Sequence, residues 1–129
     1  MATLQPNKDA EVSVVEQGII KIYSDAQNGV SGVTTSTYTV PTGKVWKLKS
    51  TFIQNAGGFT AGDSATVRYF DGTTEFFLYS EDIGSKFNCL FYQPTNDLTF
   101  QSGDVLRIIT SLSAAETYNA MILVQEFDA

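Results

Sequence analysis

The chain has no histidine, only one cysteine and no long apolar run. Without histidine there is no Ser-His-Asp triad, no Cys-His pair and no histidine metal ligand. Cys89 cannot form a disulfide within the chain, so we expect a buried free thiol in a protein assembled in a reducing cytoplasm. No segment approaches the roughly 20 apolar residues that span a bilayer, and the start of the chain lacks the pattern of a signal peptide. The sequence therefore predicts no membrane partner.

Basic residues are also scarce. Eight Lys and Arg stand against fourteen Asp and Glu, which gives a net charge of −6. Nucleic-acid backbones are bound by clustered Lys and Arg, so we expect no nucleic-acid partner. Lys44, Lys47 and Lys49 form the only basic group, and it is either a solvated strand face or a patch that docks on an acidic protein surface.

Carboxylates are more numerous, but they fall at turn signals. An Asp in a turn accepts local N–H bonds, whereas a glycosidase needs two facing carboxylates and calcium needs six to eight oxygen ligands. We therefore expect no catalytic residue, no cofactor and no metal site, and a protein that is not an enzyme. The pairs considered are Asp71 with Glu75, Glu81 with Asp82, and Asp63 with Asp104.

Short β-strand patterns fill the rest of the chain and predict an all-β fold. The expected architecture is an antiparallel β-sandwich, and the number of strands favours an eight-stranded jelly roll. Residues 1–10 are polar and predict a flexible N-terminal arm, while 11–129 form one domain. The arm is either a tether to a neighbour or a frayed end. The strands are expected at Val12–Tyr23 with a break at Gly18, Thr37–Val40, Lys44–Gln54, Ala65–Phe70, Thr74–Ser80, Phe87–Gln93, Asp97–Phe100 with Asp104–Ser111, and Thr117–Phe127.

Two segments are expected to be irregular. Ser24–Ser36 is small and polar, with Asn28-Gly29 and Gly32, and is typical of a long exposed loop or a flexible hairpin. Ser113–Glu116 matches a capping box without a helical pattern after it, which predicts one turn inside a loop.

Alternation within the strands predicts which side chains are buried. Trp46, Leu48 and Phe52 fall on one face of Lys44–Gln54 and are expected in the core. The last strand is apolar on both faces, so it is expected either to lie centrally in the sheet or to have its outer face covered by another subunit.

Two pairs of adjacent aromatic residues carry the best candidates for a surface site. Successive side chains of a strand point to opposite faces, so one ring of Phe76-Phe77 and one ring of Phe91-Tyr92 must face outward. An outward ring serves a subunit interface or a platform for sugars.

Two turn phrases have a counterpart in known proteins. Tyr38–Ser50 contains Val-Pro-Thr-Gly-Lys-Val-Trp-Lys-Leu, and Leu98–Ile109 contains Ser-Gly-Asp-Val-Leu ahead of an apolar strand. With the closing Ile122–Glu126, they make residues 38–126 resemble small phage and prophage virion proteins with a β-sandwich fold. These are capsid decoration (cement) proteins, head-fibre subunits and tail-associated jelly rolls.

The resemblance implies a structural virion protein, assembled in the host cytoplasm and located in the virion. Its expected form is a capsid decoration protein that binds the outer shell as a homo-oligomer, a trimer in the first instance. Its partners would be the major capsid protein, or another virion protein, and copies of itself. The alternative is a carbohydrate- or receptor-binding module of a tail or head fibre, which would use the same sandwich and its exposed aromatic rings.

Overall fold

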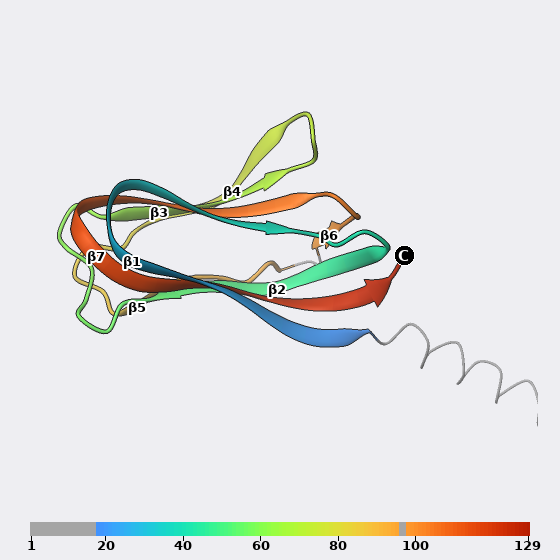
Figure 1. The fold of residues 1–129 in the computed structure, drawn as a ribbon, viewed down its shortest axis with the longest axis horizontal. Coiled ribbons are helices and arrows are strands. Elements are labelled where there is room, and N and C mark those ends of the chain that lie inside the picture. Colours follow the sequence, from blue (N-terminus) through green and yellow to red (C-terminus); the bar gives the residue numbers. More distant parts are fainter. Residues whose placement is uncertain (1–17, 96–97) are drawn as a thin grey trace, which may run out of the picture.

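A computed structural model describes residues 18–95 and 98–129, with the backbone alone for 88–91. These residues form one antiparallel sheet of seven strands (Figure 1). Strand neighbours follow the order β4-β3-β7-β2-β5, with β1 also paired to β7 and β6 to β2. No helix in these two ranges is long and apolar enough to cross a membrane. The strands are β1 (Ile19–Thr39), β2 (Lys44–Gln54), β3 (Ser64–Phe70), β4 (Glu75–Asp82), β5 (Asn88–Tyr92), β6 (Leu98–Phe100) and β7 (Val105–Asp128).

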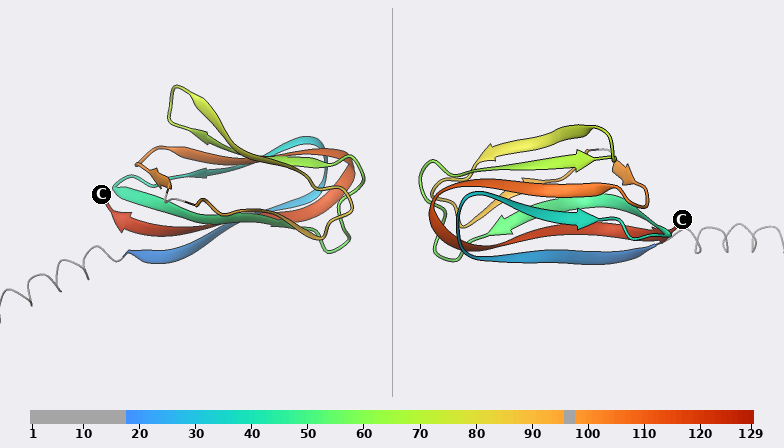
Figure 2. Two further views of the ribbon diagram at one scale, coloured as in Figure 1. Left: turned by 180° about the vertical axis from the view of Figure 1, so that it is seen from behind. Right: turned by 45° about the horizontal axis from the view of Figure 1, so that its top comes forward.

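The sheet is folded over on itself by its two longest strands. β1 and β7 pair along their whole lengths, from Ile19 opposite Glu126 to Thr39 opposite Val105. The first half of β7 also pairs with β3, and its second half pairs with β2. Both strands bend at one end of the molecule and return in the facing layer, as both views of Figure 2 show. One layer is therefore β4-β3-β7-β1, and the other is β1-β7-β2 with β5 and β6.

The prediction of a loop or hairpin at Ser24–Ser36 is wrong, because this segment lies inside β1. Its glycines mark irregularities of a continuous strand. The register to β7 shifts between Gln27 and Val30 and again between Val30 and Gly32, and Gly32 has a φ of 72°. Glycine adopts this left-handed region without the steric cost of a side chain, so it is suited to a strand that bends from one layer to the other.

The turn expected at Ser113–Glu116 is also wrong, since β7 continues through it. Ser113, Ala114 and Ala115 are exposed in succession, which interrupts the alternation of buried and outward residues in β7. This is the place where β7 bends opposite the irregular part of β1. The two strands expected at Asp104–Ser111 and Thr117–Phe127 are thus two arms of one strand.

A bulge in β2 explains one wrong core assignment. Trp46 and Leu48 are each 1% exposed, as expected, but Phe52 is only half-buried and Ile53 is fully buried. The register to β7 shifts between Leu48 and Ser50. An extra residue in a strand reverses which later side chains face the core, so Phe52 points outward.

Other boundaries agree closely with the expectation. β2 begins and ends as predicted, and β3 and β4 form the expected hairpin through Asp71-Gly72. Asp71 Oδ1 accepts the N–H groups of Thr73 and Thr74, which stabilises this turn. The expected arm at 1–10 and the strand residues before Gly18 lie outside the described residues, as does the side chain of Cys89. About eight strands were expected and seven are described, because each bent strand serves both layers.

The core lies between the layers and includes Trp46, Ile53, Val67, Ile108 and Ile122, all at most 1% exposed. Trp46 packs against Tyr23, with ring centroids 5.0 Å apart, so it joins β2 to the edge strand β1. The indole is the largest fully buried side chain. The stability of the sheet therefore depends strongly on this one residue.

Replacing Trp46 with Ala should lower the free energy of unfolding by about 3–5 kcal/mol, because it leaves a large cavity in the core. Urea unfolding followed by circular dichroism measures the change. As a matched control, Val33→Ala removes a side chain that is 74% exposed and should change stability by about 0.5 kcal/mol or less. A loss below about 1 kcal/mol for Trp46→Ala would contradict this description of the core.

Candidate docking face

The outer side of the layer β1-β7-β2 is unusually apolar. In β7 the even-numbered residues from Ala120 to Glu126 are buried, so the odd-numbered ones point outward. Residues directly opposite on paired strands share a face of the sheet. Ile22 lies opposite Leu123, Phe52 opposite Met121, and Val45 opposite Phe127. We call this surface the docking face and define it by Ile20, Ile22, Val45, Phe52, Met121, Leu123 and Phe127.

The β1 edge of the docking face is the most exposed to water. Ile20 and Ile22 are 57% and 64% exposed on this face, and Ile19 beside them is 65% exposed. Ile19 lies opposite the buried Glu126 and so belongs to the other face, which leaves two of the seven exposed large apolar side chains of the described residues, Ile20 and Ile22, on the docking face. A concentration of this kind, next to the half-buried Met121 and Leu123, is typical of a surface that a partner covers.

The three lysines of the predicted basic group do not form one patch. Lys47 lies on the docking face, with its ammonium 5.3 Å from the centre of the Phe127 ring. Lys44 lies on the opposite face of β2 from Lys47, and its ammonium is 2.6 Å from a carboxylate oxygen of Asp128. Lys49 is half-buried at the bulge, where the register to β7 shifts. The structure therefore adds one lysine directly to the docking face and separates Lys44 from it.

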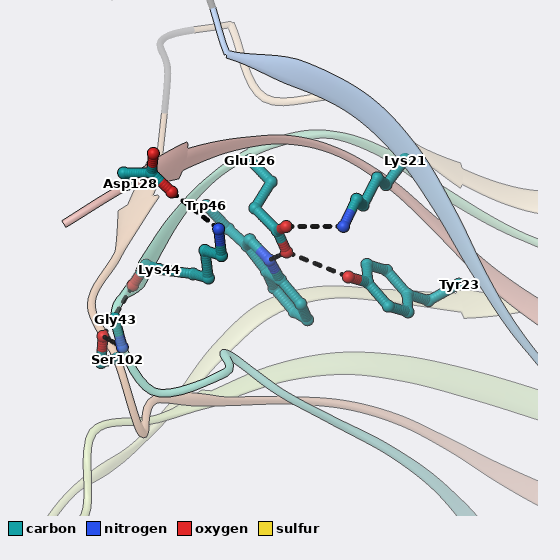
Figure 3. Close-up of polar contacts among 8 residues, drawn as sticks. All are labelled: Lys21, Tyr23, Gly43, Lys44, Trp46, Ser102, Glu126 and Asp128. Carbon is teal, nitrogen blue, oxygen red and sulfur yellow. Dashed lines mark hydrogen bonds and ion pairs between the residues drawn. The ribbon is translucent and has the colours of Figure 1, made fainter.

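A buried carboxylate fastens the open end of the layer beneath the docking face (Figure 3). Glu126 is 6% exposed. Its Oε2 accepts hydrogen bonds from Trp46 Nε1 at 2.8 Å and Tyr23 Oη at 3.0 Å, and its Oε1 lies 2.7 Å from Lys21 Nζ. The ammonium of Lys21 and the donors of Trp46 and Tyr23 lower the pKa of Glu126 to about 2, although burial opposes this shift. One ionised carboxylate thus joins β1, β2 and β7.

The two turn phrases of the sequence meet at this same end. Ser102 Oγ accepts the N–H of Gly43 at 3.1 Å and donates to the carbonyl of Lys44 at 2.8 Å. The N–H of Gly103 donates to the carbonyl of Val40, and the N–H of Ala129 to that of Gly43. Gly43 has a φ of 80°, which explains glycine in this turn. Both phrases therefore serve the fold at one end of the sheet.

The three predicted aromatic residues whose side chains are described lie outside the docking face. Phe77 is 67% exposed beneath the guanidinium of Arg68, whose Cζ is 4.0 Å from the ring centre. Phe76 is 44% exposed and stacks on Tyr69, with centroids 5.6 Å apart. Tyr92 is half-buried and stacks on Tyr79 at 5.5 Å. The side chain of Phe91 lies outside the described residues.

The turn carboxylates are engaged locally. Asp104 Oδ2 accepts the N–H of Gln101, and Asp82 Oδ1 accepts the N–H of Gly84. Glu75 forms ion pairs with Arg68 and Arg107. Among the described residues no group of three or more His, Cys, Asp or Glu is placed to hold a metal ion.

Sequence reasoning found part of the docking face and missed the rest. The two apolar faces of the last strand indicated Met121, Leu123 and Phe127. The contribution of Ile20 and Ile22 was missed because it depends on their pairing with residues about a hundred positions away. The only local signal was the Ile-Ile-Lys-Ile run that opens β1.

No protein-family model and no curated protein matches the chain. Among solved structures, the core of Drosophila NLP is 12% identical at a TM-score of 0.44, and the match covers 84% of this chain and 99% of that one. A mitogen from Yersinia pseudotuberculosis is 15% identical at a TM-score of 0.40, and the match covers 84% of this chain and 86% of that one. A virus-like particle of the extra small virus of the prawn Macrobrachium rosenbergii is 12% identical at a TM-score of 0.43, and the match covers 87% of this chain and 80% of that one. TM-scores this low carry no argument about function.

Replacing Glu126 with Gln should lower the free energy of unfolding by about 2–3 kcal/mol at pH 7, because the folded state then loses its low-pKa carboxylate. The pKa falls from 4.5 to about 2 on folding. The stabilisation is therefore present above pH 4.5 and disappears as the pH falls toward 2. Urea unfolding of both proteins at a series of pH values measures the difference.

The control is Asp128→Asn, which removes a carboxylate that is 88% exposed and ion-paired with Lys44. Exposed pairs contribute little, so this variant should stay within about 1 kcal/mol of the wild type. A stability gap between Glu126→Gln and wild type that is the same at pH 3 and pH 7 would contradict the ionised state assigned to Glu126.

Proposed function

We propose that the protein is a structural subunit of a bacteriophage particle, and specifically a capsid decoration protein that binds the outer shell as a homo-oligomer. The observation that carries the proposal is the docking face, an apolar outer surface on a folded-over sheet. Its fold is proposed to be a jelly-roll β-sandwich, because two layers enclose the core and the long strands bend between them.

The docking face supports association because apolar side chains on the outside of a sheet gain free energy when a partner removes them from water. Ile20 and Ile22 present their side chains to solvent, and Leu123 and Met121 continue the apolar surface toward Phe52 on β2. A neighbouring lysine, Lys47, adds a positive charge that suits an acidic partner.

The virion part of the proposal rests on the sequence resemblance of residues 38–126. We propose the major capsid protein, or another virion protein, as the external partner, the virion as the location and a trimer as the oligomer. Neither nucleic acid, membrane, cofactor nor catalysis is part of the proposal. The two turn phrases that carry the resemblance fasten one end of the sheet, so they relate the chain to these proteins through its fold.

A carbohydrate- or receptor-binding module of a phage fibre is the second candidate, and one observation favours it. Phe77 is 67% exposed next to Arg68, on the β3–β4 hairpin that projects from the body in Figure 1. Exposed aromatic rings stack on sugar faces. This surface belongs to the other layer of the sheet, so the two candidates use different residues.

Replacing Ile22 with Lys should weaken self-association by about 100-fold, or about 3 kcal/mol, because a charge would be buried without a partner at the interface. Light scattering over a range of concentrations measures the oligomer. Val33→Lys is the matched control, since Val33 is 74% exposed on the other arm of β1 and lies outside the docking face. Ile22→Lys should also abolish rebinding to phage particles stripped of the protein, whereas Val33→Lys should not.

Two results would contradict the proposal. One is a wild-type protein that is monomeric at high micromolar concentration and fails to bind stripped particles. The other is an equal loss of association for Ile22→Lys and Val33→Lys. Binding of glycans that is lost in Phe77→Ala, in a protein that stays monomeric, would favour the second candidate.

A further inference from the structure

Two buried carboxyl groups lie at the bent end of the sheet, far along the strands from Glu126. Asp63 ends the loop that precedes β3 and is fully buried, and Glu116 of β7 is 8% exposed. Val30 of β1 is the residue opposite Glu116, at the irregular part of that strand. The two acids therefore sit where β1, β7 and the loop of residues 55–63 come together.

Asp63 joins the loop to β7. Its Oδ1 accepts hydrogen bonds from the N–H of Ser113 at 2.8 Å and from Ser113 Oγ at 3.0 Å. Its Oδ2 accepts the N–H of Thr60 at 2.9 Å. These are the contacts of an ionised carboxylate that uses both oxygens as acceptors.

Glu116 is satisfied on one side only. Its Oε1 accepts hydrogen bonds from Asn55 Nδ2 and from the N–H of Thr60, each at 3.2 Å. Its Oε2 is buried and has no hydrogen-bond partner. The N–H of Thr60 thus serves both acids, which places their carboxyl groups next to each other. In the part of the chain that the structure describes, no Lys or Arg forms an ion pair with either of them.

We propose that Asp63 and Glu116 share one proton, carried by Glu116 Oε2 and donated to Asp63, and that this pair is a pH-sensitive latch between the loop of residues 55–63 and the bend of β7. Two adjacent buried carboxylates repel each other when both are ionised, and a shared proton removes the repulsion. It also gives the unpartnered oxygen of Glu116 a hydrogen bond to make.

The surroundings favour a proton on Glu116. Burial and the neighbouring Asp63 raise the pKa of Glu116 from 4.5 to about 7. Burial opposes ionisation of Asp63 as well, but the hydrogen bonds from Glu116 and Ser113 outweigh it and lower its pKa. Burial raises the pKa of Tyr118 on β7, as do the nearby charges of Asp25 and Glu116, and none of these groups is positive. Lys86, whose backbone carbonyl accepts the N–H of Phe59 in the loop of residues 55–63, has its ammonium 3.2 Å from a carboxylate oxygen of Glu81.

A pocket of about 420 Å³ lies beside Glu116, and its lining includes Asn55, Gly57, Gly58, Thr60, Glu116 and Thr117. The pKa of Glu116 is higher in the folded than in the unfolded chain, so its contribution to stability is fully present below pH 4.5 and is lost as the pH rises through about 7. Above that pH the latch opens, and residues 55–63 lose their firm attachment to β7.

The chain itself gives a clear test, because it has no histidine and few other groups titrate between pH 5 and 7.5. The melting temperature of the untagged wild type should fall by about 5–10 °C from pH 5 to pH 8. Glu116→Gln keeps the carbonyl acceptor for Asn55 and Thr60 and provides a permanent donor to Asp63. Its melting temperature should match that of the wild type at pH 5 and stay there at pH 8.

Asp128→Asn is the control, since it also removes one negative charge but at an exposed site, and it should keep the wild-type pH dependence. In the wild type, hydrogen exchange of the amides of Thr60 and Ser113 should become faster above pH 7 by more than the intrinsic effect of pH on exchange. In Glu116→Gln these amides should show the intrinsic effect alone. A wild-type melting temperature that is flat over this range would overturn the proposal. So would a Glu116→Gln variant with the wild-type slope.

A direct titration keeps the test valid even if Glu116→Gln folds poorly. The side-chain carboxyl carbon of Glu116, followed by NMR in the wild type, should titrate with a midpoint near 7. A midpoint below 5 would show that Glu116 is ionised across the range and that no proton is shared.

Discussion

The pairing of β1 with β7 is the constraint on which the rest of the structure depends. These two strands lie side by side from Ile19–Glu126 to Thr39–Val105 and bend together, so they supply strands to both layers. β2 and β3 attach to opposite arms of β7. Since β1 begins the described chain and β7 ends it, the sheet needs contacts between residues that are far apart in sequence, and we expect slow folding for that reason.

A buried carboxylate fastens each end of the folded-over sheet, and the two differ in protonation. At the open end Lys21 holds Glu126 ionised, and the carboxylate joins three strands. At the bent end no Lys or Arg of the described residues forms an ion pair with Asp63 or Glu116, and the proposed proton relieves the repulsion between these two carboxyl groups. The same side-chain chemistry therefore gives a connection that weakens only as the pH falls below 4.5 at one end, and one that weakens as the pH rises through about 7 at the other.

Local signals in the sequence predicted the local parts of this fold. Gly43 and Asp71-Gly72 marked turns that the structure confirms, and alternation placed Trp46 in the core. The bends were not predictable in this way, because Gly29, Gly32 and Ser113–Glu116 have the composition of loops. These segments become strand only because β1 and β7 pair with each other here. Phe52 was misplaced for a similar reason, since a bulge leaves no reliable trace in the pattern of apolar residues. The docking face combines strands β1, β2 and β7, so only its β7 part was visible in the sequence.

The central claim is that the docking face is covered in the assembled protein. The most direct measurement places a photoreactive phenylalanine analogue at position 22 and, separately, at position 33, then maps the cross-links formed in a mixture of isotopically distinct subunits and stripped phage particles. We predict that position 22 forms cross-links to a second copy or to a shell protein, and that position 33 forms few. Cross-links from position 22 that stay within one chain, or that are no more frequent than those from position 33, would contradict the claim.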